Sequence, residues 1–165
     1  MKKTNYNSAK VLLILFITAI LGIGCTQVQV YERTANISGT EWQNTQVPTF
    51  TFDVTDTTKE YNVYVVLRHT NLYPFRNLWL DVGIQNNNDT LRYQKFEIQV
   101  ANASQWLGTG MKDVYEHRAP LFPSAIRFQQ TGKVTFHLKQ IMRRNPLPGV
   151  LQVGIRVQPA SFTEG

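Results

Sequence analysis

The sequence predicts an all-β protein, folded as an antiparallel β-sandwich of about seven to eight strands. Three observations indicate this class. Several short runs alternate apolar and polar residues, and turn-forming residues separate those runs. No segment after residue 24 repeats apolar residues at helical spacing over three turns. A chain of 165 residues, 42% of them hydrophobic, is long enough for one such domain with a buried core.

The alternating runs mark the expected strands. Successive side chains of a strand point to opposite faces, so every second residue of a run faces the core. In chain order the runs are Phe50 to Val54, Tyr61 to Leu67, Leu78 to Ile84, Phe96 to Val100, Val134 to Leu138 and Leu151 to Val157. On their apolar sides we expect six residues in particular to be buried: Val65, Leu80, Val82, Phe136, Val153 and Ile155.

The segments between the runs have the composition of turns. Residues 86–89, Asn-Asn-Asn-Asp, predict a hairpin loop because Asn and Asp tolerate left-handed backbone and bond nearby amides. Residues 130–132 and 145–149 predict two further turns. Residues 101–118 break the alternation, and we expect a long loop or one helical turn that crosses between the sheets.

The first 25 residues have the order of a secretory signal. Three lysines and no acidic residue accompany an apolar run over residues 11–23, which is shorter than the roughly 20 apolar residues of a membrane-spanning helix. Residues 21–25, Leu-Gly-Ile-Gly-Cys, resemble a bacterial lipobox. We therefore expect cleavage before Cys25 and acylation of its thiol and amine, which anchors the mature chain to membrane lipid.

This interpretation divides the chain into three parts. Residues 1–24 are a cleaved lipoprotein signal peptide, residues 25–46 a lipidated tether with a first strand, and residues 47–165 a single β-sandwich domain. The expected location is the cell envelope, with the domain in the periplasm. The sequence leaves open whether the anchor lies in the inner or the outer membrane.

Composition excludes several function classes. Removal of the signal peptide leaves 14 basic against 11 acidic residues, an excess too small to indicate the clustered basic stripe typical of nucleic-acid binding. The single cysteine excludes an internal disulfide and a zinc site with two or more thiolates. His69, His117 and His137 show no metal-ligand spacing. We expect no metal and no cofactor.

Catalytic motifs are also missing. No serine lies in a G-x-S-x-G elbow, and Gly108-Thr109-Gly110 lacks the surroundings of a phosphate loop. Paired carboxylates could still meet in space, and Asp81, Glu97 and Glu116 are the candidates, although exposed strand or loop acids are the commoner case. The sequence therefore favours a protein that is not an enzyme.

One interruption between two expected strands has the composition of a contact surface. Residues 68–77 place aromatic and basic side chains around a proline, and Tyr and Arg are common hot-spot residues of protein interfaces. The partner-contact candidates are Arg68, Tyr73, Phe75, Arg76 and Asn77. The alternative is that the two aromatic side chains plug the end of the sandwich while Asn77 bonds loop backbone.

Several blocks of the sequence resemble a known family in their order and spacing. They are the signal ending at Cys25, Leu67-Arg68-His69 with Tyr73-Pro74-Phe75 and Asn77-Leu78, residues 108–113, and the groups 132–136, 140–143, 147–150 and 153–157. On these blocks the chain is similar to the gliding-motility lipoprotein GldH family. The resemblance implies an envelope lipoprotein needed for gliding, associated with machinery that also drives a dedicated secretion system. It implies no enzymatic activity.

Two functional hypotheses follow. The first is an envelope lipoprotein that acts through contacts with other envelope proteins of the gliding and secretion machinery. The second is a membrane-tethered module that binds or processes glycans. Trp42, Trp79 and Trp106 distinguish them, because a sugar site of this kind exposes two coplanar aromatic rings whereas a scaffold buries them.

Overall fold

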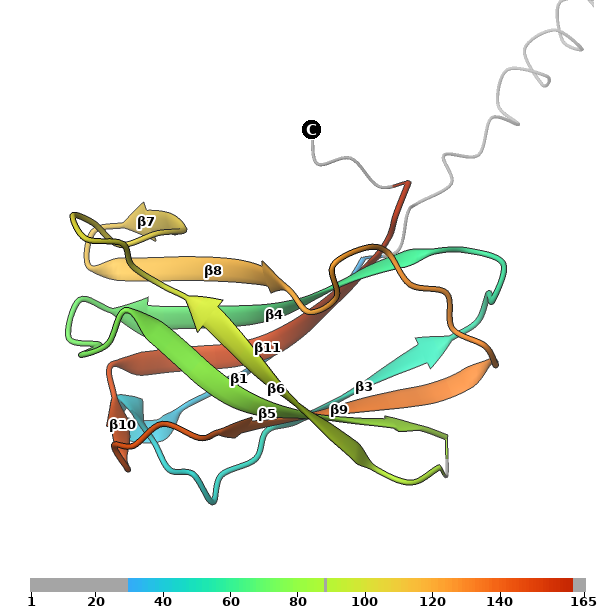
Figure 1. The fold of residues 1–165 in the computed structure, drawn as a ribbon, viewed down its shortest axis with the longest axis horizontal. Coiled ribbons are helices and arrows are strands. Elements are labelled where there is room, and N and C mark those ends of the chain that lie inside the picture. The colour runs from blue at the N-terminus through green and yellow to red at the C-terminus, as the bar shows by residue number, and fades with distance from the viewer. Residues whose placement is uncertain (1–29, 88, 162–165) are drawn as a thin grey trace, which may run out of the picture.

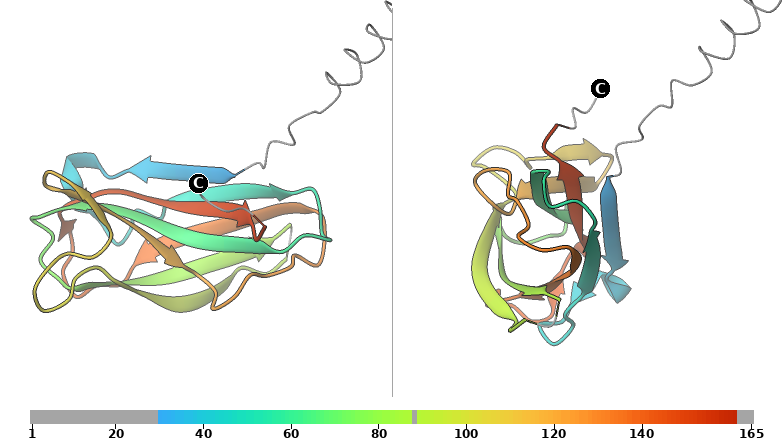
Figure 2. Two further views of the ribbon diagram at one scale, coloured as in Figure 1. Left: turned by 90° about the horizontal axis from the view of Figure 1, so that it is seen from above. Right: turned by 90° about the vertical axis from the view of Figure 1, so that its right-hand side faces the viewer.

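The computed structural model describes residues 30–87 and 89–161, so Cys25 and the signal segment lie outside the described residues. Apart from one short 3-10 turn, the regular secondary structure of this part consists of antiparallel strands, which form two main sheets packed face to face (Figures 1 and 2). Eight strands have six or more residues, and three others have two or three. The predicted all-β sandwich is confirmed.

The first sheet has five strands in the order β1, β11, β4, β8, β7. Strand β11 lies between β1 and β4, so the first and last strands of the described chain are neighbours. The bounds are β1 Tyr31–Asn36, β4 Tyr61–Thr70, β7 Thr109–Met111, β8 Val114–Pro120 and β11 Val150–Pro159. Because β1 belongs to this sheet, part of the segment expected as a tether with a first strand is integral to the sandwich.

The second sheet has four strands in the order β3, β9, β5, β6. A short pair, β10 with β2, lies at one end of the sandwich, just after a single 3-10 turn, η1. The bounds are η1 Ser38–Thr40, β2 Glu41–Trp42, β3 Thr49–Val54, β5 Asn77–Asn86, β6 Arg92–Gln99, β9 Gly132–Gln140 and β10 Leu147–Pro148. Within the described residues, no helix is long and apolar enough to cross a membrane.

The core lies between the two sheets and is built from the apolar sides of the alternating strands. All six residues predicted to be buried are at most 1% exposed, which confirms the register expected from the sequence. The hairpin expected after residue 86 is also confirmed, since β5 pairs with β6 across it. Asp89 N donates to the carbonyl of Asn86 over 2.8 Å within this turn.

The prediction for residues 101–118 is wrong in its second half. Instead of a loop or helical turn, the chain forms the β7–β8 hairpin, and β8 pairs with β4 over seven residue pairs. Strand β8 has only weak apolar alternation, because Tyr115 and His117 occupy positions on its inner face. Because these inward-facing residues carry polar atoms, the sequence of β8 does not alternate clearly between apolar and polar residues, and the strand was not predicted.

Candidate functional site

The segment singled out in the sequence lies at one end of the sandwich. This end, called the loop end below, consists of residues 70–77 between β4 and β5, residues 100–113 up to the β7–β8 turn, and residues 141–149 (left in Figure 1). Backbone hydrogen bonds join the three segments. Thr70 N donates to Gly149 O over 2.8 Å, and both Val100 N and Ala101 N donate to Arg76 O.

Tyr73 anchors the first of these segments in the core. Its side chain is 2% exposed, and its hydroxyl donates to Asn77 O over 2.8 Å, while burial raises the pKa of the phenol. Gly149 lets the neighbouring loop approach, because its φ is +81° and a Cβ there would lie 2.6 Å from Tyr73 N. The ring of Tyr73 thus plugs the end of the sandwich, as in the alternative stated for this residue.

A cluster of rings surrounds His69, which ends the inner face of β4. The centroids of Trp106, His117, Tyr73 and Tyr115 lie 4.7, 5.0, 5.2 and 5.5 Å from that of His69. His69 is fully buried and His117 is 5% exposed. We call these five residues the ring cluster, and it connects β4, β8 and two segments of the loop end.

The two histidines of the ring cluster bond each other. His69 Nδ1 lies 2.8 Å from Thr70 O, and since a carbonyl only accepts, that nitrogen carries the proton. In the neutral ring Nε2 of His69 is then an acceptor, so His117 Nε2 donates to it over 3.0 Å. The arrangement satisfies both nitrogens of His69 while the His69 ring is neutral, because a protonated His69 has no acceptor for the His117 proton.

Burial favours this neutral state. Desolvation lowers the pKa of His69, although its hydrogen bond to Thr70 O opposes the change. Desolvation also lowers the pKa of His117 to about 4, helped by His69 and opposed by Glu116. The pair is therefore an uncharged packing element near neutral pH.

The outer surface of the loop end is unusually apolar. Leu72 is 75% exposed, Met111 79% and Val114 37%. The three residues belong together because Val114 is the register partner of both Met111 and Thr70, while Asn71 donates to Asp113 from its backbone and from Nδ2. We call Leu72, Met111 and Val114 the tip surface.

Arg68 lies on the outer face of the five-stranded sheet, where it lines a surface hollow together with Val114 of the tip surface. Its Nε donates to Glu116, and its Nη1 donates to Gln152 Oε1 over 2.9 Å. The ion pairs continue across the strands, with Glu116 at 3.1 Å from Arg118 and Glu32 at 2.7 Å from Arg156. Arg68 is therefore part of a network that spans four strands.

The other predicted contact residues occupy intermediate positions. Phe75 is half-buried with its ring 6.1 Å from that of Tyr73, and Asn77 donates to Glu97 Oε1 over 2.6 Å. Arg76 extends an exposed side chain while its carbonyl holds residues 100 and 101. The structure thus brings Tyr73, Phe75, Arg76 and Asn77 to the loop end, but exposes mainly Arg76.

Sequence reasoning missed the ring cluster and two thirds of the tip surface. The signal for His69 was present, because the alternation of Tyr61, Val63, Val65 and Leu67 continues to it by one more step. The third histidine, His137, is half-buried; its Nδ1 lies 3.3 Å from Thr49 Oγ1, while its Nε2 is buried and has no partner within the described residues.

Two further expectations bear on chemistry. Across residues 30–87 and 89–161, no group of three or more His, Cys, Asp or Glu side chains could hold a metal ion. The three tryptophans do not form a sugar platform, because Trp42 is fully buried, Trp106 packs in the ring cluster and Trp79 alone among them is exposed, at 37%.

Comparison with known proteins decides the family. The model of the GldH lipoprotein family matches residues 29–157. This chain belongs to the GldH lipoprotein family. The gliding motility lipoprotein GldH of Flavobacterium johnsoniae is 33% identical over 153 residues, which cover 88% of this chain and 94% of the relative.

A GldH homolog of Christiangramia forsetii is 29% identical over 163 residues, covering 92% of this chain and 96% of the relative. No solved structure matches the chain. The GldH match includes all eleven strands up to Val157, so the loop end, the ring cluster and the tip surface lie within the region of similarity.

Proposed function

We propose that this GldH-family chain is a non-enzymatic lipoprotein of the cell envelope that takes part in gliding motility and its linked secretion machinery through protein contacts made by residues 70–77. The relatives carry gliding motility in their names, which supports the process. The anchor is Cys25 acylated at the end of its signal segment. Other envelope proteins are the partners.

One observation carries the contact site. Residues 70–77 are held in place by the buried side chain of Tyr73 and by backbone hydrogen bonds to two other loops. The side chain of Leu72 in the same segment is 75% exposed. A rigid loop that displays a large apolar side chain loses little conformational entropy on binding. Such a loop suits protein recognition better than a plain turn does.

The test replaces exposed groups and leaves the plug intact. Leu72→Asp with Arg76→Glu should abolish co-purification of envelope partners and fail to restore spreading of a Flavobacterium johnsoniae strain lacking GldH. The melting temperature should stay unchanged, because both side chains are exposed.

A matched control changes exposed groups on the outer face of β6. Tyr93→Ser with Lys95→Glu should keep both partner recovery and spreading. Undiminished partner recovery by the Leu72 and Arg76 double variant, with an unchanged melt, would remove this segment from the contact site.

A further inference from the structure

Residues far from the loop in sequence extend its surface. Met111 and Val114 join Leu72 through the β7–β8 hairpin, so the two most exposed large apolar side chains of the described residues, Met111 and Leu72, lie at the same end together with Val114. Asn71 clamps the hairpin through two bonds to Asp113, of 3.1 Å each. The tip surface is therefore one composite patch rather than a single loop.

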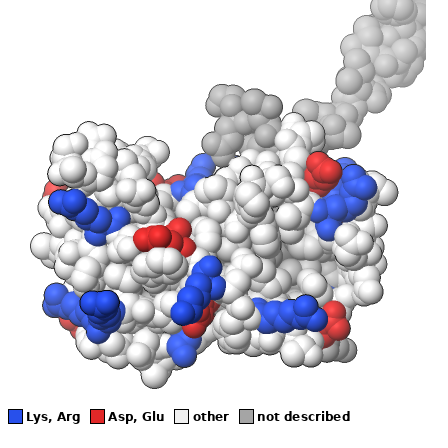
Figure 3. Space-filling view, in the orientation of Figure 1, with Lys and Arg blue, Asp and Glu red and all other residues white. Residues whose placement is uncertain are grey.

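Exposed basic residues outnumber acidic ones at this end of the sandwich. Arg76, Lys112, Arg143 and Arg144 are exposed residues of the loop end, and none forms an ion pair with another described residue. Asp113 is the acidic residue among these segments, and Asn71 binds its carboxylate. Figure 3 shows two groups of blue spheres at this left-hand end, with smaller areas of red beside them. A complementary surface would combine an apolar centre with acidic residues around it.

The strand register places the anchor at the opposite end. Tyr31 of β1 is level with Val157 of β11, which is level with Val63 near the start of β4. Strand β1 runs in the same direction as β4, toward the loop end (Figure 2, left). Thr70, where the loop end begins, is seven residues beyond Val63, or about 23 Å further along the sandwich.

The connection to the anchor is short. Five residues separate Cys25 from Tyr31, so even a fully extended chain spans at most about 20 Å. The start of β1 is therefore held near the bilayer, and an upright domain turns the loop end away from it. A basic surface can bind either anionic lipid or an acidic protein surface. In this orientation the lipid of the anchoring membrane is the less accessible of the two.

We propose that the tip surface binds the apolar, acid-rimmed surface of another envelope protein, on the side of the domain that faces away from the anchoring membrane. This inference rests on the proposed function and adds the residues of the β7–β8 hairpin, the partner chemistry and the orientation. A second copy of the chain and the bilayer itself are the other occupants that the experiment distinguishes.

The experiment uses the full acylated chain in cells, with a photoreactive benzophenone side chain at one position at a time. Leu72 and Met111 probe the tip surface, while Tyr93 on the outer face of β6 and Lys59 at the anchor end are controls. We expect adducts from both tip positions with the same protein and none with it from the controls. Adding Leu72→Asp should lower the Met111 adduct about tenfold, whereas Tyr93→Asp should leave it unchanged.

Each other outcome overturns the inference in a recognisable way. Lipid adducts from the tip would show that the domain lies on its own membrane, and adducts with a second copy would show self-association. Adducts from Leu72 alone, or with different proteins at the two positions, would remove the composite patch and leave the proposed loop contact standing. The absence of any adduct from Leu72 and from Met111 would contradict both the composite patch and the proposed loop contact.

Discussion

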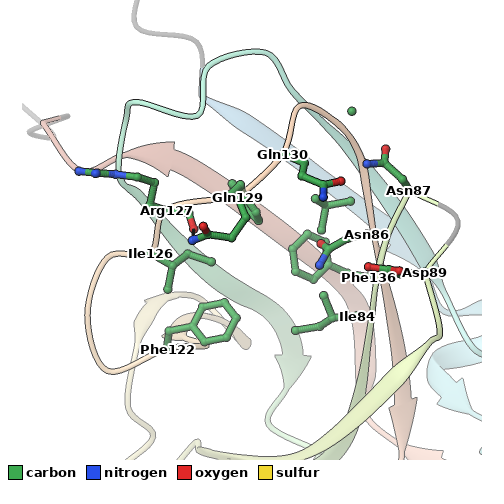
Figure 4. Close-up of a pocket in the computed structure, with 13 residues that line it drawn as sticks. Ile84, Asn86, Asn87, Asp89, Phe122, Ile126, Arg127, Gln129, Gln130 and Phe136 are labelled. Carbon is green, nitrogen blue, oxygen red and sulfur yellow. Dashed lines mark hydrogen bonds between the residues drawn. The ribbon is translucent and has the colours of Figure 1, made fainter.

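The two ends of the sandwich are closed in different ways. At the loop end, five rings fill the space between the sheets, and His69 at their centre is fully buried. At the other end, a cavity of about 370 Å³ remains between the end of β5, the start of β9 and residues 121–131. Figure 4 shows apolar side chains such as Ile84 and Phe122 on one side of it and the amides of Gln129 and Gln130 on another.

This difference predicts which end presents the more fixed shape. A packed end holds its loops through contacts on several sides, so the surface above it is pre-organised for binding. An end with a cavity retains empty space and half-buried side chains, among them Phe122 and Ile126, that can rearrange. The contrast predicts that equivalent truncations at the two ends differ in cost.

The largest effect is expected at Tyr73. Tyr73→Ala removes the plug of the loop end and should lower the free energy of unfolding by about 3 to 5 kcal/mol, the range for buried aromatic residues. Denaturant unfolding measures the change. Tyr73→Phe is the control, because it keeps the ring and loses only the bond to Asn77 O, at a cost of about 1 kcal/mol. A loss below about 0.5 kcal/mol for the alanine variant would contradict the packed end.

A pH-dependent effect of intermediate size should arise from the histidine pair. In the unfolded chain His117 titrates near 6.5, whereas in the folded protein burial lowers its pKa to about 4. The unfolded state therefore binds more protons between these values, so stability is complete above pH 6.5 and falls as the pH drops to 4. The loss is on the order of 3 kcal/mol.

The pH prediction has a matched control. The double variant His69→Phe with His117→Phe keeps two stacked rings but cannot take up protons, so its stability should change much less between pH 6.5 and 4. The ring signals of His117 in the wild-type protein should also titrate well below pH 6 by NMR. A midpoint for His117 near 6.5 would show that this ring is not buried in solution.

The smallest effect is expected at the end with the cavity. Phe122 is half-buried beside empty space, so Phe122→Ala should cost only about 1 kcal/mol, well below Tyr73→Ala. Thermal or denaturant unfolding of the two variants under one set of conditions gives the comparison directly. Equal costs would mean that both ends are packed alike in solution.

Much of the sandwich follows from the sequence because its long strands alternate strictly. Phe136 and Leu80 were predicted on the core side from neighbours in their own strands, and such local patterns need no knowledge of pairing. The ring cluster is different. His69 and His117 are 48 residues apart, and their contact depends on the register of β4 with β8. The tip surface likewise depends on which hairpin meets which loop.

The position of β11 has a consequence for how the chain folds. This strand is the last in chain order among the described residues, yet it lies inside the five-stranded sheet and pairs with β1 and β4 on its two sides. That sheet cannot assemble until residues 150–159 are available, and pairings over such long stretches of chain form slowly. If the chain is exported and acylated at Cys25 as proposed, the five-stranded sheet forms only after residues 150–159 have crossed the membrane, so Cys25 crosses before the domain closes.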